Sequence, residues 1–417
     1  MTDRRRYVRR PGGTAMTVTP PPPYPLDAHG TDQHGENRAL RERGPVASVE
    51  LPGGLTAWAV TGHDELQALL GDQRVGKNPG NWRALQEGQV PEGWPLLGMV
   101  TIPGMTSADG ADHRRLRGLV SQGFTPRRVE ALRPHVESVV AELVERLERL
   151  APGPVDLREH FAYPLPMRVI GELLGIPAEL YDELHGHAGT LVRSSATPQE
   201  ALAARHGLVE LLGRVAADRR ADPGDDMTSD LLAAREADDR LSEEEVVGTM
   251  MLMFIAGHAT TLNLITNAVR ALSAHPDQRD AALAGTVTWS AVVEETLRHD
   301  SPVAHFPLRF ALDDIEVGGV VIRRGDAILA SYAASGRDPR RHEDAERFDA
   351  TRSPNRHLSF GHGLHFCLGA PLARLEAEVA LRELYGRFPA LVVAGETTPI
   401  ASFVSNSVQS LPVALLD

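Results

Sequence analysis

The longest apolar segment of the chain, residues 246–269, restricts the possible folds more than any other feature. A segment of this length lies either in a membrane or in the core of a large protein. Polar residues interrupt it, among them His258, Asn263 and Thr266, and they favour a buried helix over a membrane span. Since no other segment approaches the length of a span, we expect a soluble protein that does not enter a membrane.

The rest of the sequence favours a mainly α-helical fold with small β-sheets. Two alternating stretches, 46–60 and 315–322, each contain a glycine pair that suits a hairpin turn. The charged stretch 220–245 is predicted to be a solvated connection. Apolar residues three and four positions apart predict helices at 129–150, 199–219, 246–272, 287–298 and 370–388.

We expect a single domain that spans residues 30–417. A chain of 417 residues is long enough for two or three domains, but no Gly/Ser-rich linker or internal repeat divides it. Residues 1–29 are predicted to form a flexible tail. They contain five arginines and a run of four prolines, but not the apolar segment of a signal peptide.

Charge and cysteine content exclude several classes of protein. The formal net charge of −13 argues against a nucleic-acid partner, because phosphate binding requires a basic surface. The single cysteine, Cys367, excludes an intramolecular disulfide and a zinc site built from several cysteines. A chain without disulfides is typical of the reducing cytoplasm, where we expect this protein to reside.

The residues around Cys367 favour a functional thiol. Gly361 and Gly363 permit a tight loop, and the apolar periodicity after Cys367 predicts that a helix begins there. Backbone N–H groups and the dipole at a helix start favour a thiolate and lower the pKa of the thiol. A lone cysteine is commonly just a small buried hydrophobic residue, but the glycine loop, the nearby histidine and the helix start together favour a metal ligand.

Six residues of this segment have a distinctive spacing. The pattern Phe-Gly-x-Gly-x-His-x-Cys-x-Gly occurs at Phe360, Gly361, Gly363, His365, Cys367 and Gly369. It resembles the haem-binding loop of the cytochrome P450 family. The resemblance implies that haem b lies between a long oxygen-binding helix and the helix after the cysteine, with the Cys367 thiolate ligating the iron.

A second motif of that family precedes the cysteine segment. Glu295 and Arg298 match its Glu-x-x-Arg motif, and Arg352 matches the later arginine that completes the same ion network. Glu and Arg three residues apart are by themselves usually only a pair on a helix surface. Their order and spacing relative to Cys367 support the resemblance.

Four further residues match the groups that bind haem propionates in the family. His113 and Arg117 are one turn apart on a predicted helix and share a face, and Arg309 and His365 match two more propionate partners. Charge-assisted hydrogen bonds to carboxylates explain why arginine and histidine suit these positions. Each residue alone could equally be a basic group that faces solvent.

The long apolar segment contains a match to the oxygen-binding helix of the family. Ala256 and Gly257 match its small residues, which leave room for oxygen, and Thr260 matches the threonine that hydrogen-bonds dioxygen. The family usually has Asp or Glu directly before this threonine, whereas this chain has Ala259. Either water, His258 or a substrate group carries protons instead, or the reaction depends less on that acid.

The resemblance extends over residues 44–416 and implies a monooxygenase. The implied reaction inserts one oxygen atom of O2 into a C–H bond of a bulky hydrophobic substrate, such as a macrolide, a steroid or a related natural product. A separate ferredoxin and ferredoxin reductase are expected to supply electrons, since no flavin or iron–sulfur domain is apparent in the chain. We expect an acidic ferredoxin to dock near Arg114, Arg115 and Arg356. The alternatives are a P450 that performs oxidative coupling or uses peroxide, and a haem sensor without catalysis.

Substrate contacts are expected from the segments that line the distal pocket in the family. These are residues 74–105, 186–195 and 303–308, the oxygen-binding helix and the turn 403–407. The candidates within them are Trp82, Trp94, Leu96, Leu97, Met105, His305, Phe306 and Phe403.

Overall fold

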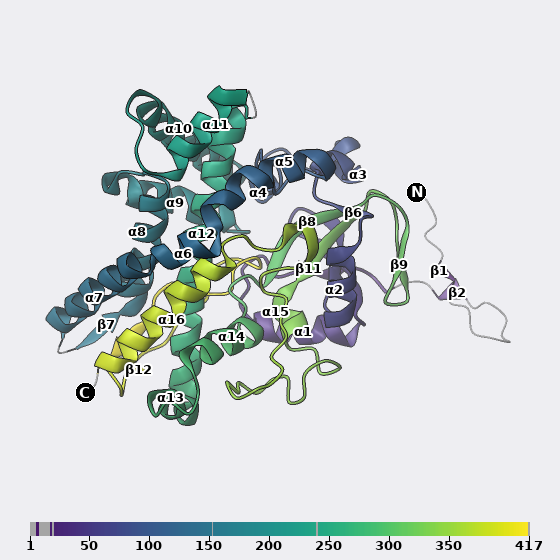
Figure 1. The fold of residues 1–417 in the computed structure, drawn as a ribbon. Helices are drawn as coiled ribbons and strands as arrows, with labels where there is room; N and C mark the ends of the chain where they lie inside the picture. The colour runs from purple at the N-terminus through teal and green to yellow at the C-terminus, as the bar shows by residue number, and fades with distance from the viewer. Residues whose placement is uncertain (1–5, 8–16, 19–20, 152, 239–240, 416–417) are drawn as a thin grey trace.

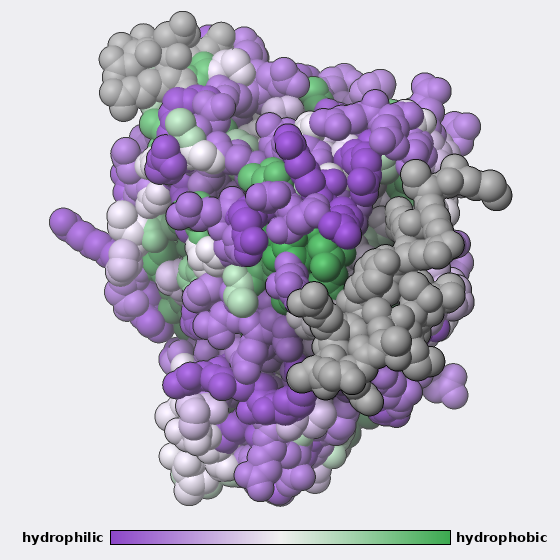
Figure 2. Space-filling model, turned by 90° about the vertical axis from the view of Figure 1, so that its right-hand side faces the viewer, coloured by the Kyte–Doolittle hydropathy of each residue, from purple (hydrophilic) through white to green (hydrophobic). Residues whose placement is uncertain are grey.

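The computed structural model describes residues 6–7, 17–18, 21–151, 153–238 and 241–415. Most helices gather on one side of the molecule, and a six-stranded sheet lies on the other side (Figure 1). The predicted mainly α-helical fold with small sheets is therefore confirmed. The side that carries the sheet has a mostly hydrophilic surface with a small hydrophobic group near its centre (Figure 2).

The predicted core helix is α12, Glu243–Ala274. Ser242 begins it with a capping box, in which its hydroxyl accepts the Glu245 N–H and the Glu245 carboxylate accepts the Ser242 N–H. The helix is long and apolar enough to span a membrane, but 67 % of its most apolar window is buried inside the protein. It packs against α8 (Pro164–Leu173), α10 (Pro198–Ala221), α14 (Trp289–His299) and α16 (Ala370–Arg387).

The other predicted helices also form. The segment 129–150 is divided at Leu132 into α6 and α7, because Pro134 begins a new helix near its first turn. The remaining helices are α1 (Gln33–Glu42), α2 (His63–Gly71), α3 (Arg83–Gln86), α4 (Leu97–Val100), α5 (Gly110–Ser121), α6 (Pro126–Ala131), α7 (Arg133–Leu150), α9 (Tyr181–Val192), α11 (Met227–Asp238), α13 (Pro276–Leu283) and α15 (Tyr332–Gly336).

The charged stretch 220–245 was predicted to be a solvated connection, and this prediction is wrong for its middle. Residues Met227–Asp238 form α11. Met227, Leu231 and Leu232 are buried and give the helix an apolar face, which packs into the same cluster as α10 and α12. Their spacing of one turn was present in the sequence, but the surrounding acidic residues and arginines obscured it.

Both predicted hairpins are confirmed. Strands β4 (Val46–Leu51) and β5 (Leu55–Val60) pair antiparallel, as do β9 (Ile315–Val317) and β10 (Val320–Ile322). The large sheet has the order β3-β4-β5-β11-β8-β6, and a three-stranded sheet has the order β12-β13-β7. The other strands are β1 (Arg6–Tyr7), β2 (Thr17–Val18), β3 (Tyr24–Pro25), β6 (Val75–Gly76), β7 (Pro154–Asp156), β8 (His305–Ala311), β11 (Ala327–Ser331), β12 (Val392–Val393) and β13 (Pro412–Ala414).

The boundary of the predicted tail differs from the structure. Tyr24 and Pro25 pair with β4 as strand β3, and the next residue, Leu26, is buried in the core. A two-residue strand among prolines has too little periodicity to be recognised in a sequence. Most of the predicted tail, residues 1–5, 8–16 and 19–20, lies outside the described residues.

Candidate haem-binding and active site

One large pocket brings the predicted site residues together. It has a volume of about 1450 Å³, part of it open to solvent. All eleven residues predicted for catalysis, cofactor binding and metal ligation line it: Ala256, Gly257, Thr260, His113, Arg117, Arg309, Phe360, Gly361, His365, Gly369 and Cys367.

The cysteine loop is shaped by its two glycines. Gly361 and Gly363 have φ angles of 74° and 71°, which favour glycine. A Cβ atom on Gly363 would lie 2.7 Å from the Leu70 carbonyl oxygen, so no larger residue fits there. The Cys367 N–H donates to the Phe360 carbonyl at 2.9 Å and closes the loop. The glycines thus hold Cys367 against the pocket wall.

The expected lowering of the Cys367 pKa is wrong in this structure. Helix α16 begins at Ala370, and the N–H groups of Gly369 and Ala370 do lower the pKa of the thiol, as does the charge of Arg117. Burial among protein groups outweighs them and raises the pKa above its ordinary value. The side chain is nevertheless accessible from the pocket. The helix start by itself does not hold a thiolate, whereas metal coordination deprotonates a thiol outright.

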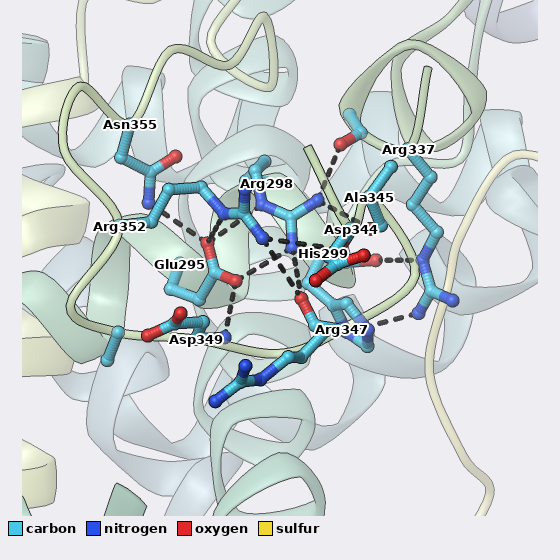
Figure 3. Close-up of polar contacts among 12 residues, drawn as sticks. Glu295, Arg298, His299, Arg337, Asp344, Ala345, Arg347, Asp349, Arg352 and Asn355 are labelled. Carbon is cyan, nitrogen blue, oxygen red and sulfur yellow. Dashed lines mark hydrogen bonds and ion pairs between the residues drawn. The ribbon is translucent and has the colours of Figure 1, made fainter. Parts of the chain in front are cut away.

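The predicted ion network of Glu295, Arg298 and Arg352 forms, as Figure 3 shows. Arg298 donates to both carboxylate oxygens of Glu295 at 2.7 and 2.8 Å, and both side chains are fully buried. The Arg352 guanidinium lies 3.6 Å from the same carboxylate. Arg298 also donates to the carbonyl oxygens of Gly336, Ala345 and Arg347, each at 2.8 Å.

This network fastens α14 to the chain that leads into the cysteine loop. Asn355 and the Asp349 N–H also donate to Glu295, at 3.1 and 2.7 Å (Figure 3). Removing one partner of such a buried pair leaves an uncompensated charge and costs about 3–5 kcal/mol. The three predicted residues are thus brought together as a structural element.

A second network was missed by the sequence analysis. Glu294 accepts hydrogen bonds from Arg374 at 2.6 and 3.0 Å and contacts His357 at 3.1 Å. Burial alone would raise the pKa of Glu294, but His357 and Arg374 outweigh it and lower the pKa to about 2. The Arg374 guanidinium also lies 4.5 Å from the centre of the Phe360 ring. This network joins α14, the cysteine loop and α16. No sequence feature indicated it, because Glu294 is a single glutamate next to the Glu-x-x-Arg motif and belongs to no motif itself.

The predicted propionate partners gather around His365. The rings of His365 and His113 have centroids 4.2 Å apart. Burial lowers the pKa of His365 to about 2, and the positive charges of Arg309, Lys77 and Arg117 contribute to the shift. Arg117 also donates to the Phe366 carbonyl at 2.7 Å, beside the cysteine.

These groups fit the carboxylates of a haem. Both ring nitrogens of His113 and the Nε of Arg309 are buried without a hydrogen-bond partner in the described part of the chain. Buried polar groups are seldom left unpaired, so a ligand with acceptor oxygens matches their requirement. A thiol and a group of cationic side chains on one pocket therefore suit a haem held through its iron and its carboxylates.

The predicted oxygen-binding face of α12 also lines the pocket. The Thr260 hydroxyl donates to the Ala256 carbonyl at 2.7 Å, one turn earlier in the helix. Its lone pairs remain free to accept a hydrogen bond. Gly257 has an additional structural reason to be small, because a Cβ atom there would lie 2.8 Å from Ile170 Cδ1 of α8.

His258 is directed away from this face. It is 1 % exposed and does not contribute to the pocket. Its Nδ1 lies 2.7 Å from the Phe254 carbonyl, and its Nε2 lies 3.1 Å from His185 Nδ1 of α9. Burial, with the nearby charge of His185 next, lowers the pKa of His258 to about 3, so the ring is neutral at ordinary pH. His258 therefore links α12 to α9 and is not placed to deliver protons near Thr260.

Most of the candidates for substrate contacts lie outside this pocket. Met105 and Phe306 line the pocket, but the other six candidates do not. Trp82 packs against Trp94 and Phe310, with ring centroids 5.5 and 5.7 Å apart. Side chains of these types suit a protein core equally well, and these six are buried or partly buried in the interior. They are Trp82, Trp94, Leu96, Leu97, His305 and Phe403.

Two ionisable pocket residues were not singled out from the sequence. Lys77 follows β6 and is 6 % exposed. Glu376 lies on α16 and is the one acidic residue among the described residues that line the pocket. Lys77 and Glu376 belong to none of the motifs that indicate the family, and only the fold shows that both are buried at this site.

Comparisons with known proteins agree over nearly the whole chain. Residues 288–409 match the family model described as Cytochrome P450. The chain is 42 % identical over 401 residues to the 2-hydroxy-5-methyl-1-naphthoate 7-hydroxylase of Streptomyces carzinostaticus, covering 94 % of this chain and 97 % of that protein. It is 37 % identical over 406 residues to the 6-deoxyerythronolide B hydroxylase of Saccharopolyspora erythraea, covering 95 % and 100 %.

A solved structure shows the same likeness. The structure of CYP154A1 from Streptomyces coelicolor A3(2) matches with a TM-score of 0.90 and 48 % sequence identity, covering 94 % of this chain and 100 % of that chain. Similarity at this level of identity and coverage, together with the cysteine pocket, shows that the chain belongs to the cytochrome P450 family of haem-thiolate oxidoreductases.

Proposed function

We propose that this protein is a monooxygenase that inserts one oxygen atom of O2 into a C–H bond of a bulky hydrophobic natural product. The main support is the single pocket that Cys367 shares with Thr260 of α12 and with the cationic group around His365. The similar proteins from Streptomyces carzinostaticus and Saccharopolyspora erythraea are hydroxylases. A sensor would need neither a large apolar pocket nor Thr260, so the enzyme is the better supported function.

The proposed site assigns a role to each group. Cys367 would ligate the iron of haem b, and His113, Arg117, Arg309 and His365 would bind the haem carboxylates. When bound, the haem supplies the activation of dioxygen. The protein residues position it and exclude bulk water from the pocket.

Proton delivery in this proposal does not involve a carboxylate on α12. Thr260 donates its own proton to Ala256, so its oxygen acts as an acceptor that holds a water or a substrate hydroxyl in the pocket. Ala259 offers no acid, and His258 faces α9. Of the carriers considered from the sequence, water and a substrate group are the two that the geometry favours.

The lining of the pocket suits a large apolar substrate. Met105, Ile170, Leu252, Val303 and Phe306 contribute apolar side chains from four separate segments. This lining supports the proposed substrate class of macrolides, steroids and related natural products.

Electrons would come from a separate ferredoxin and its reductase. Arg114 and Arg356 are exposed, whereas Arg115 pairs with Glu245 at 2.6 Å and is less available. Leu364 of the cysteine loop is 62 % exposed and adds an apolar contact. An acidic ferredoxin would dock on this surface in the cytoplasm, and charge reversal of Arg114 and Arg356 should slow ferredoxin-driven reduction at low ionic strength. Unchanged reduction would refute this docking surface.

The function is tested first through the metal ligand. Cys367→Ala should remove the thiolate features of the optical spectrum of the haem-loaded protein, while Leu364→Ala, in the same loop, should retain them. An unchanged Cys367→Ala spectrum would contradict the proposal.

The reaction type is tested separately. Compounds that shift the haem spectrum are offered with either a ferredoxin system or peroxide. Hydroxylated product from the ferredoxin system supports the monooxygenase. Product from peroxide alone, or a coupled product, would favour the alternative P450 chemistry, and binding without any product would favour a sensor.

A further inference from the structure

The turn 102–107 contributes to the pocket wall and is held together by its own hydrogen bonds. Met105 and Thr106 line the pocket. The Ser107 N–H donates to the Gly104 carbonyl at 3.2 Å, and the Ser107 hydroxyl donates to the same carbonyl at 3.3 Å. Gly104 has a φ of 140°, which favours glycine. Because the turn is closed in this way, a shift of its backbone also shifts Met105 and Thr106.

This turn lies directly against α12 at Gly248. A Cβ atom on Gly248 would lie 2.1 Å from the Pro103 carbonyl oxygen and 3.3 Å from the Pro103 Cβ. Non-bonded carbon atoms are best separated by about 3.5–4.0 Å, so the two backbones approach this closely only because residue 248 has no side chain. Glycine is less favourable than alanine inside a helix, and the close approach of the turn is a reason for a glycine here.

The contact marks the end of the pocket along α12. The helix lines the pocket with residues between Leu252 and Leu264, and Gly248 precedes Leu252 by one turn. At a rise of about 1.5 Å per residue, Leu252 lies about 12 Å along the helix from Thr260. The turn therefore meets α12 just beyond the pocket, and Met105 extends from there to the pocket wall.

A methyl group added at residue 248 would displace the turn rather than the helix. Helix α12 is held by α8, α10, α14 and α16, whereas Pro103 and Met105 are only partly buried. Relief of a 2.1 Å contact requires a shift of roughly 1 Å or more. The shift is directed away from α12, so it withdraws Met105 and lengthens the pocket.

We propose that Gly248 is a positioning residue for the substrate. It seats the turn 102–107 against α12, so that Met105 ends the pocket and limits how far a substrate extends along the helix from Thr260. Gly248 itself acts through Met105 and does not line the pocket. This inference rests on the proposed function, because it requires that the substrate lies in this pocket, and it adds a selection of hydrophobic substrates by length.

The test measures pocket length with 1-alkylimidazoles of increasing chain length on the haem-loaded protein. The free ring nitrogen of these probes ligates haem iron, so that the alkyl chain extends from a fixed point. A spectral titration gives the dissociation constant of each probe. The variants are Gly248→Ala, Met105→Ala and their combination. Gly213→Ala in α10 is the matched control, because a Cβ atom on this helical glycine would have no atom within 4 Å.

In the wild type, each CH2 group that enters the pocket should tighten binding about four-fold, until the chain reaches Met105 and the affinity stops rising. We expect this limit to move to longer chains, by about one or two carbon atoms, in Gly248→Ala and in Met105→Ala. Gly248→Ala should have a smaller effect in the Met105→Ala background, since Gly248 acts through Met105. Gly213→Ala should keep the wild-type limit.

The inference is overturned if the limit of Gly248→Ala stays at the wild-type chain length or moves to shorter chains. It is also overturned if Gly213→Ala shifts the limit equally. Met105→Ala keeps the test decisive should Gly248→Ala fail to fold, because an unchanged limit in Met105→Ala would show that Met105 does not end the pocket.

The shortest probe, 1-methylimidazole, separates failure of this inference from failure of the proposed function. It does not reach Met105, so all variants should bind it with the affinity of the wild type. If they do and the length limit is the same in each, the role of Gly248 is refuted and the proposed function stands. If the wild-type protein shows no spectral shift with 1-methylimidazole, the proposed haem site itself is contradicted.

Discussion

Replacing Glu376 by glutamine should change how the stability of this protein depends on pH. Glu376 is 2 % exposed, and its Oε2 has no hydrogen-bond partner in the described part of the chain. Burial raises the pKa of this carboxyl from 4.5 to about 8. At neutral pH the folded protein therefore keeps a proton on Glu376 that the unfolded chain has released.

The sign and size of the effect follow from this difference. Between pH 4.5 and about 8 the folded state binds more protons at this site than the unfolded state, so the free energy of unfolding falls as pH rises. Across this pH interval the free energy of unfolding falls by roughly 4–5 kcal/mol, because each pH unit contributes about 1.4 kcal/mol. Glu376→Gln cannot ionise and should lose this dependence.

The assay is denaturant unfolding of the haem-loaded proteins at several pH values from 5 to 8. We expect the stability of Glu376→Gln relative to the wild type to increase steadily across this range, because all other titrating groups cancel in the difference. Glu378→Gln, a change on the same helix at a partly exposed position, should show no such trend. A constant difference between Glu376→Gln and the wild type would refute the reasoning.

Three other substitutions test the packing of the site. Gly363→Ala should destabilise the cysteine loop by about 1–3 kcal/mol and speed haem loss, because it places a Cβ atom at a φ of 71° and 2.7 Å from the Leu70 carbonyl oxygen. Denaturant unfolding measures the loss of stability. Gly257→Ala should destabilise the α8–α12 contact, and Ile170→Val in the same chain should restore part of the loss in a double-mutant cycle. His258→Gln should reduce the loss of stability on acidification from pH 6.5 towards 3, because between these values the His258 ring is protonated in the unfolded chain and neutral in the folded protein. Denaturant unfolding at several pH values measures this, and equal acid sensitivity of the variant and the wild type would contradict it.

The sequence alone identified the long core helix, the hairpins and eleven of the residues that line the main pocket. These features depend on local periodicity or on spacing along the chain, which a sequence records directly. Cys367 and Thr260 lie far apart in the chain, but each belongs to a short motif whose residues are set by its own loop or helix turn. Eleven predicted site residues therefore line one pocket.

Only the tertiary structure decided which apolar and ionisable side chains are at the site. Trp82 and Phe306 are both aromatic residues within predicted substrate segments, but Trp82 is in the core and Phe306 lines the pocket. Lys77 and Glu376 are charged residue types that a sequence places on the surface by default, and the packing of distant elements buries them. Periodicity shows which face of an element is apolar, but it does not show what covers that face, because that depends on contacts between residues far apart in the chain.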